Sequence, residues 1–240
     1  SYPERLAYQI SWFENNPDID VVAGMATYQA HKPETGGFQR YVSWSNQIKS
    51  HHEISLKIFI ESPIINPTVM WRKTTSNKYG SYADGEFPED YELWLRWMSK
   101  GAKFHKLDIP VVKWYDSDNR LTRTDQRYSD EAFFKIKTVY LAKWLKLNNP
   151  FYPEVVIWGA SKISRKRAAL LISREIQITA FIDITQKRQV ERKIIYYQDM
   201  PSPKDIFVLV YLKEETMRSQ TIQFLHKRGF REEENYLLVS

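Results

Sequence analysis

The residue pair best suited to chemistry is Glu89-Asp90, two adjacent carboxylates that directly follow Pro88. Because proline is favoured in the first turn of a helix, we expect a helix to begin here and to run to about Lys100. One carboxylate could act as a general base, since a carboxylate within hydrogen-bond reach of a hydroxyl can take its proton as the oxygen attacks. The pair could equally have a structural role, because acidic side chains in a first turn stabilise the positive end of the helix dipole.

Proline, glycine and apolar periodicity predict the elements that surround this pair. Gly36-Gly37 is interpreted as a turn that leads into a strand, and Gly101 is expected to end the helix that begins at Pro88. The predicted elements of this part are helices at 3–13, 46–59 and 128–147, and strands at 20–25, 38–44, 68–71 and 103–115.

A linker is predicted at residues 148–153, where Asn148-Asn149-Pro150 is followed by Pro153. After the linker, short apolar strands alternate with helices, and this alternation favours a parallel sheet. The predicted strands lie at 155–158, 178–183, 206–211 and 236–239, and the helices at 165–173 and 214–228. We therefore expect two α/β domains, one at residues 1–147 and a small Rossmann-like one at residues 153–240.

A possible nucleotide site is suggested by Gly159, which follows the first strand of the second domain. Asp183 ends the next strand at about the distance at which dinucleotide-binding folds place a ribose-binding acid. Ser161 and Ser164, however, replace the second and third glycines of that fingerprint, so a pyrophosphate would find less room. The sequence favours a module without a bound dinucleotide, and a nucleotide-dependent oxidoreductase is the weaker alternative.

Five short motifs follow one another in residues 1–147. They are Arg5-Leu6 with Gln9, Asp18-Ile19-Asp20-Val21-Val22, Asn66-Pro67-Thr68-Val69-Met70 with Arg72-Lys73, Glu89-Asp90 with Leu93 and Arg96, and Asp116-Ser117 with Asn119 to Arg123. In this order they resemble the family-2 inverting glycosyltransferases of GT-A fold. The resemblance implies a partial GT-A domain, without its N-terminal nucleotide-binding part, followed by the Rossmann-like domain.

This resemblance implies an enzyme that moves a sugar from a nucleotide-sugar donor to a glycan or lipid-linked acceptor in bacterial surface polysaccharide synthesis. Asp90 is then the general base, and Glu89 orients the acceptor or supports the loop. Asn66 and Trp94 are expected to bind substrate, although many relatives carry histidine where this chain has Asn66. Trp94 is one of eight tryptophans, whose flat rings can cover the apolar face of a sugar or fill a core.

A departing nucleoside diphosphate needs positive charge, which a divalent metal and basic side chains supply. Arg120 and Arg123 are the basic residues that could reach the diphosphate, and the alternative is an ordinary exposed basic segment. Arg96 is expected to pair with Glu92, four residues earlier on one helix face.

The DxD-type metal motif and the nucleotide-binding strands of such enzymes would precede Ser1. We therefore expect Mg²⁺ or Mn²⁺ in a longer enzyme whose main metal ligands are absent from this chain, and we expect the chain alone to be inactive. Asp18-Ile19-Asp20 has the same spacing, but it leads from an Asn-Pro stop into an apolar strand and is interpreted as a turn. A non-catalytic binding or regulatory fragment is the alternative function.

The composition, with 42% hydrophobic and 27% charged residues among 240, fits a globular protein. No cysteine occurs, which excludes disulfides and thiolate metal sites, and the five histidines form no evident ligand set. The net charge of +6 favours anionic partners such as sugar nucleotides, lipid phosphates or an acidic membrane face, and it does not indicate nucleic acid. Without an apolar run of ~18 residues or a signal peptide, we expect a cytoplasmic protein, with peripheral association at the inner face of the membrane as a further option. The sequence does not indicate an oligomeric state.

Overall fold

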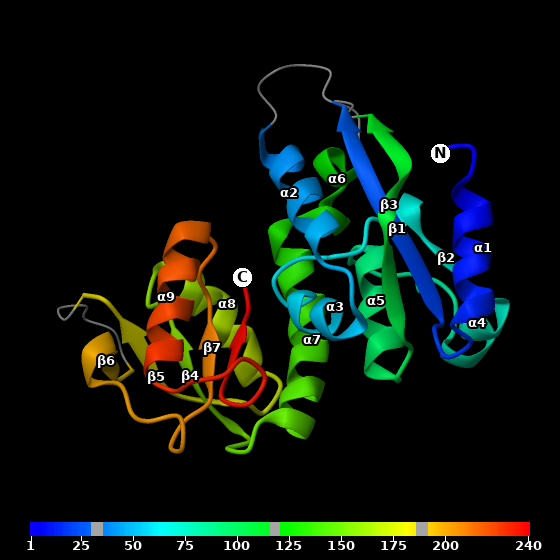
Figure 1. Ribbon diagram of the computed structural model, residues 1–240. Coiled ribbons are helices and arrows are strands. Elements are labelled where there is room, and N and C mark those ends of the chain that lie inside the picture. Colours follow the sequence, from blue (N-terminus) through cyan, green and yellow to red (C-terminus); the bar gives the residue numbers. More distant parts are fainter. Residues whose placement is uncertain (30–35, 116–120, 186–191) are drawn as a thin grey trace. The chain divides into compact units, whose positions relative to one another are not determined.

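The computed structural model in Figure 1 describes residues 1–29, 36–115, 121–185 and 192–240, and at residues 121 and 123 it describes the backbone alone. The chain forms two compact units, Ser1–Ile136 and Lys137–Ser240. Each unit contains a β-sheet together with helices, so the chain is α/β. The domain limits expected from the sequence, 1–147 and 153–240, stay a prediction.

The first unit contains a mixed three-stranded sheet with the order β2-β1-β3. Its strands are β1 (Val21–Gln29), β2 (Met70–Trp71) and β3 (Phe104–Tyr115). β1 pairs in parallel with β3 and antiparallel with β2. The start of β1 is an unbroken apolar run because both faces of the strand are covered, and Val21, Val22 and Ala23 are completely buried.

Gly24 lies where the backbone of β1 meets a bulky side chain of β3. The register between the two strands shifts between Ala23 and Met25. A Cβ added at Gly24 would lie 2.5 Å from both γ-carbons of Val111 on β3. Only glycine fits this approach without displacing its neighbour.

Helices connect and cover these strands (Figure 1). They are α1 (Arg5–Asn15), α2 (Gly36–Gln47), α3 (His51–Lys57), α4 (Lys73–Tyr79), α5 (Glu89–Ser99) and α6 (Leu121–Thr124), with the short 3₁₀ helices η1 (Asn66–Thr68) and η2 (Gln126–Tyr128). The long helix α7 (Asp130–Asn148) contains the boundary between the two units. α1 is joined to β1 and η1 by Gln9, whose Nε2 donates to the carbonyls of Val22 and Thr68 at 3.0 and 2.9 Å.

The strand expected at residues 38–44 is wrong, because these residues lie within α2. Val42 and Ser45 are buried, and the rings of Phe38 and Tyr41 contact Trp114 at centroid distances of 6.0 and 6.2 Å. Spacings of three and four residues place these side chains on one helical face. Packing against β3 therefore decides the conformation, and Gly36-Gly37 begins a helix in place of the turn that the sequence predicts.

The single helix expected at residues 46–59 is also wrong, because α2 ends at Gln47 and α3 begins at His51. Ser50 and Glu53 form a capping box at this second start. The Glu53 backbone N–H donates to Ser50 Oγ at 3.2 Å, and the Ser50 N–H donates to the Glu53 carboxylate at 2.9 Å. Serine followed three residues later by glutamate is a signal for a helix start, so the break could have been predicted.

The second unit contains a five-stranded sheet with the order β6-β5-β4-β7-β8, parallel throughout as the sequence predicts. Its elements after α7 are β4 (Glu154–Trp158), α8 (Lys162–Ile172), β5 (Gln177–Asp183), β6 (Ile194–Tyr196), η3 (Tyr197–Asp199), β7 (Val208–Val210), α9 (Glu215–Lys227) and β8 (Tyr236–Leu238). β6 was not predicted, because it is only three residues long, half-buried and preceded by a polar stretch. Counted from β4, the strand order 3-2-1-4-5 is that of a doubly wound sheet.

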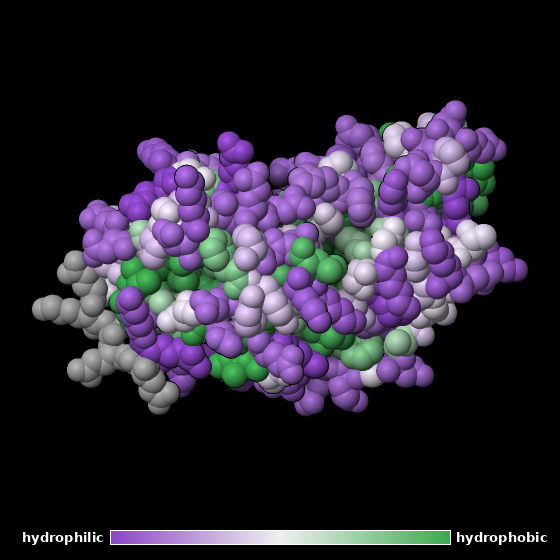
Figure 2. Space-filling model, turned by 90° about the horizontal axis from the view of Figure 1, so that it is seen from below, coloured by the Kyte–Doolittle hydropathy of each residue, from purple (hydrophilic) through white to green (hydrophobic). Residues whose placement is uncertain are grey.

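The surface seen in Figure 2 is largely hydrophilic, and hydrophobic side chains appear there in small separate areas. Large hydrophobic side chains that reach the solvent include Leu6, Tyr82 and Tyr115. Within the described ranges, no helix combines the length and the apolar character needed to cross a bilayer.

Candidate active site

The carboxylate pair lies in the first turn of α5, which contains Glu89, Asp90 and Glu92. Gly101 follows the helix with a φ of +92°, so the predicted start and stop of this helix are confirmed. The chain then enters β3, and Figure 1 shows α5 running back along that strand. The first turn of α5 is therefore the end of the helix farther from the start of β3.

Asp90 is half-buried at the second position of α5. Its Oδ1 accepts a hydrogen bond of 2.7 Å from the backbone N–H of Tyr91. Burial, together with the neighbouring negative charge of Glu89, raises the pKa of the Asp90 carboxyl to about 6. At neutral pH this carboxylate is thus mostly ionised and more basic than an ordinary aspartate, as a general base requires.

Glu89 is held by a tyrosine from a distant part of the chain. The hydroxyl of Tyr128, at the end of η2, donates to Glu89 Oε2 at 2.5 Å. Burial raises the pKa of Tyr128, and the bond to Glu89 raises it further, so the hydroxyl keeps its proton and remains the donor. Sequence analysis indicates Tyr128 only as the start of a helix, because no local pattern joins two residues 39 positions apart.

Arg127 places a positive charge next to this pair. Its Nη2 lies 2.7 Å from Asp125 Oδ2, and its backbone N–H donates to Asp125 Oδ1 at 2.9 Å. The bonds to Asp125 raise the pKa of Arg127, and the charges of Tyr128 and Glu89 add to this effect. Sequence analysis missed Arg127. The side chain of Arg123 and the whole of Arg120, which it favoured, lie outside the described residues.

Asn66 contacts an exposed tyrosine. Asn66 is the first residue of η1 and is half-buried. The hydroxyl of Tyr82, in the segment between α4 and α5, donates to Asn66 Oδ1 at 3.1 Å. Burial raises the pKa of Tyr82, and the charges of Asp90 and Glu89 add to the increase. Tyr82 therefore contacts Asn66 and lies within range of the charges of Glu89 and Asp90.

Trp94 does not reach the surface of this site. Its side chain is 0% exposed, and its ring packs edge-on against three other rings. The neighbouring rings are Trp71, Trp97 and Phe104, at centroid distances of 6.1, 5.6 and 6.0 Å. α5 buries side chains on most of its circumference, so in this structure Trp94 fills the core beneath the carboxylate pair and has no surface for a substrate.

The expected pairing of Arg96 with Glu92 is confirmed, and Arg96 also donates hydrogen bonds to backbone carbonyls. Its Nε and Nη2 donate to the two carboxylate oxygens of Glu92 at 2.9 and 3.1 Å. Its Nη1 also donates to the Tyr79 carbonyl at 2.6 Å, and its Nη2 donates to the Ser81 carbonyl at 2.6 Å. Arg96 therefore ties the segment that leads to Tyr82 to the side of α5.

The described parts of the chain contain no group of three His, Cys, Asp or Glu side chains that could hold a metal ion. Asp18 pairs with the side chain of Lys103 at 3.1 Å, and Asp20 accepts from the Lys103 backbone N–H at 2.8 Å. The Ile19 N–H donates to the Asn16 carbonyl at 3.2 Å, which closes a turn. These contacts support the interpretation of Asp18-Ile19-Asp20 as a turn that holds the start of β3, and they do not fit a metal site.

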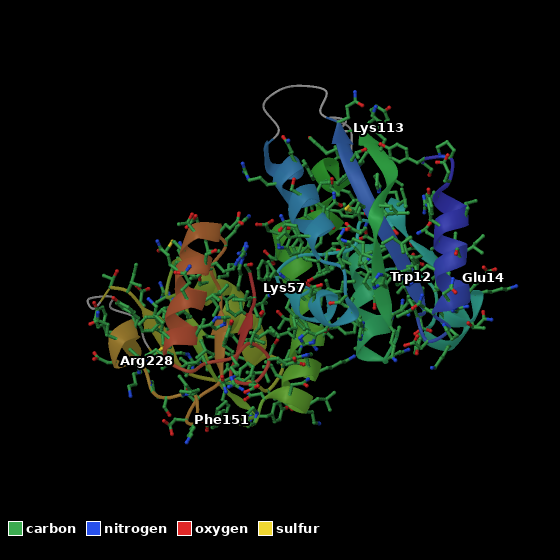
Figure 3. All side chains as sticks on the ribbon, viewed as in Figure 1. Trp12, Glu14, Lys57, Lys113, Phe151 and Arg228 are labelled. Carbon is green, nitrogen blue, oxygen red and sulfur yellow. The ribbon has the colours of Figure 1, made fainter. Side chains whose placement is uncertain are left out.

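A hollow of about 420 Å³ lies between α1 and β3. Trp12, labelled in Figure 3, points from α1 toward the strands and stacks on His105 at 4.2 Å. The residues that line the hollow are Tyr8, Ser11, Trp12, Asn15, Asn16, Leu107, Asp108 and Ile109. None of the predicted site residues is among them.

Comparison with known proteins gives two relatives, both named as glycosyltransferases. Over 111 residues the chain is 32% identical to the amylovoran biosynthesis glycosyltransferase AmsE of Erwinia amylovora, and the match covers 46% of this chain and 39% of AmsE. Over 167 residues it is 23% identical to an uncharacterized glycosyltransferase of Methanocaldococcus jannaschii, with 65% of this chain and 53% of the relative covered. These relatives support a glycosyltransferase family. No protein-family model matches the chain, and the chain spans less than two thirds of either relative.

The Gly159 turn of the second unit packs closely against the end of β7. Gly159 has a φ of +112°, and a Cβ there would lie 3.1 Å from the Tyr211 carbonyl oxygen after β7. Ser164 Oγ donates to the same carbonyl at 3.0 Å. The two oxygens of Asp183 accept from the backbone N–H groups of Ala160 and Thr185 at 3.2 and 2.9 Å. The module without a dinucleotide stays a prediction.

Proposed function

We propose that the chain carries the acceptor-activating part of an inverting family-2 glycosyltransferase of GT-A fold, with Asp90 as the general base. The observation that carries the proposal is the half-buried Asp90 at the head of α5, beside Glu89, with a pKa of about 6. One of the two relatives is named for the biosynthesis of amylovoran, and we place this chain in the synthesis of a surface polysaccharide.

In the proposed reaction, Asp90 removes the proton of an acceptor hydroxyl while that oxygen forms a bond to the anomeric carbon of the donor sugar. The bond from that carbon to the nucleoside diphosphate breaks, and the diphosphate leaves with the electron pair. Glu89, which the Tyr128 hydroxyl holds at 2.5 Å, accepts a hydrogen bond from a neighbouring acceptor hydroxyl and so orients it. Attack from the side opposite to the leaving group inverts the anomeric centre.

The leaving diphosphate requires positive charge. Arg127 is a described cation whose charge interacts with that of Glu89, and we propose it for this role together with Arg120 and Arg123. Mg²⁺ or Mn²⁺ remains an expectation for the whole enzyme, and no step is assigned to it because the described residues do not fit a metal site. We place the reaction in the cytoplasm, at the inner face of the membrane, with a glycan or lipid-linked acceptor.

The test is the change Asp90→Asn in the intact protein of the encoding strain. Membranes of that strain supply acceptors, and the release of nucleoside diphosphate from a panel of UDP-, GDP- and dTDP-sugars is measured. Transfer should fall by at least ~100-fold, the usual contribution of a general base. The matched control is Asp108→Asn, a carboxylate on β3 whose side chain is 85% exposed.

Retained transfer in Asp90→Asn would refute the assigned base. Wild-type membranes that release no nucleoside diphosphate from any donor would favour the non-catalytic binding or regulatory function. Circular dichroism and NMR spectra of the variant must match those of the wild type, since Asn keeps an oxygen that can accept the Tyr91 N–H bond.

A further inference from the structure

The ring of Tyr82 is exposed, and it is connected to the helix that carries the carboxylate pair through Trp71. The side chain of Tyr82 is 43% exposed, whereas the Trp94 expected in this role is 0% exposed. The charges of Asp90 and Glu89 reach the Tyr82 hydroxyl and help to raise its pKa, in addition to the larger effect of burial. Tyr82 therefore offers what Trp94 lacks, a ring surface that a ligand can reach near the base.

Ring contacts connect Tyr82 to the helix that carries Asp90. Trp71 of β2 lies edge-on to Tyr82 at a centroid distance of 6.3 Å and to Trp94 at 6.1 Å. Asp90 precedes Trp94 by four residues, so the two side chains lie on one face of α5, one turn apart. Trp71 thus packs between the ring of Tyr82 and one face of α5. Asp90 lies on this face in the first turn of the helix.

The segment that carries Tyr82 is held by contacts made without any ligand. Arg96 donates to the carbonyls of Tyr79 and Ser81, both at 2.6 Å, while Glu92 holds its guanidinium. The indole Nε1 of Trp97 donates to the Gly80 carbonyl at 2.8 Å. Three successive carbonyl groups before Tyr82 are therefore bound to side chains of α5, and the position of the ring is largely fixed on folding.

Polar groups accompany the ring of Tyr82. Tyr82 donates to Asn66 Oδ1, which leaves the Nδ2 donors of Asn66 without a hydrogen-bond partner in the described part of the chain. Flat aromatic rings cover apolar faces of ligands, and a small number of placed polar groups fixes the orientation. A ring, an amide donor and two carboxylates suit a neutral, hydroxyl-rich pyranose.

We propose that Tyr82 and Asn66 form the binding subsite for the acceptor sugar, with the ring of Tyr82 against the apolar face of the pyranose and the amide of Asn66 bound to one of its hydroxyls. The proposal rests on the proposed function, because that function supplies the reason for a sugar beside Asp90. Tyr82 is a specificity-determining residue in this arrangement, and Arg96 is a positioning residue that acts through the backbone of residues 79–81.

The experiment measures saturation transfer by NMR from the chain to four methyl glycosides, those of glucose, galactose, mannose and N-acetylglucosamine. At least one glycoside should receive saturation from the wild type at millimolar concentration. Tyr82→Ala should weaken its binding by roughly 5- to 10-fold, in line with the contribution of one aromatic contact. Tyr82→Phe should lose less, because the ring remains. The matched control is Tyr8→Ala, another exposed tyrosine, which lies on α1 and should bind as the wild type does.

Two results would overturn the subsite. One is equal binding to the wild type and to Tyr82→Ala, and the other is the absence of saturation transfer to all four glycosides in the wild type. The two proposals can thus fail separately, since the proposed function is refuted by transfer in Asp90→Asn and the subsite by unchanged binding in Tyr82→Ala.

Discussion

Asp90→Asn is expected to stabilise the first unit at neutral pH, even though it should abolish transfer. The folded-state pKa of Asp90, about 6, lies above the ordinary value of 3.8 because burial disfavours the charged form. The stability that this elevation provides is present below the unfolded-state pKa, and it is lost as the pH rises through the folded-state value. Above pH 7 the folded protein therefore carries the full cost of the ionised carboxylate, which the neutral amide of the variant would remove.

The expected size follows from the two pKa values. A difference of about two pH units corresponds to ~3 kcal/mol in the free energy of unfolding at pH 7.5. At pH 4.5 most of Asp90 is protonated in the folded state, and the same substitution should stabilise by only ~1 kcal/mol. The signature of the effect is therefore the change of about 2 kcal/mol between the two pH values.

Urea unfolding monitored by the methyl NMR signals of Leu93 and Leu95 measures this free energy. Both side chains are buried on α5, so they report on the first unit even if the two units unfold separately. Asp108→Asn is the control, because it removes only the exposed pair with Lys49 and should change stability by less than ~1 kcal/mol at both pH values. A destabilising effect of Asp90→Asn at pH 7.5, or an effect of equal size at both pH values, would show that the burial argument is wrong.

Three further substitutions test the packing of the first unit. Arg96→Ala should destabilise the first unit by ~3–5 kcal/mol, because it removes the bidentate partner of the buried Glu92 carboxylate. Arg96→Lys should recover little of this stability, since lysine cannot form the same two parallel hydrogen bonds. Thermal unfolding of both variants measures the loss of stability. Gly24→Ala should lower the free energy of unfolding by ~1–3 kcal/mol in a urea titration, because the added methyl group meets Val111. The double variant with Val111→Ala should recover part of this free energy. If it recovers none, the steric explanation is wrong. Lys106→Met should lower the free energy of unfolding by ~3 kcal/mol in the same urea titration, because the buried Nζ donates to the Ser45 and Pro63 carbonyls and to Ser45 Oγ. An unchanged urea midpoint would count against these bonds.

The sequence predicts those parts of the fold in which local signals and packing agree. Pro88, the acidic first turn and Gly101 mark α5 correctly, because cap and dipole preferences act within a single turn. The strand expected at residues 38–44 failed because Gly36-Gly37 suggested a turn, whereas the contact of α2 with Trp114 favours a helix. That contact joins segments far apart in the chain, and no window of local sequence contains it.

The site could be predicted only in part, for the same reason. The carboxylate pair was evident because its residues are adjacent. Tyr82 and Tyr128 were missed because each contacts its partner across 16 or 39 positions, and tyrosines are frequent in this chain. The role expected for Trp94 depended on its exposure, which the sequence of α5 does not reveal, since apolar side chains occur on nearly all sides of this helix.

The bonds from Arg96 and Trp97 to the carbonyls of residues 79–81 tie the segment that precedes Tyr82 to α5, the helix that carries Asp90. A displacement of α5 is therefore expected to move this segment together with the base. The entropy of ordering this segment is then lost during folding, so a ligand would meet a surface that is already organised. A substitution of Arg96 should consequently alter the position of the Tyr82 ring, because its guanidinium holds the carbonyls of Tyr79 and Ser81.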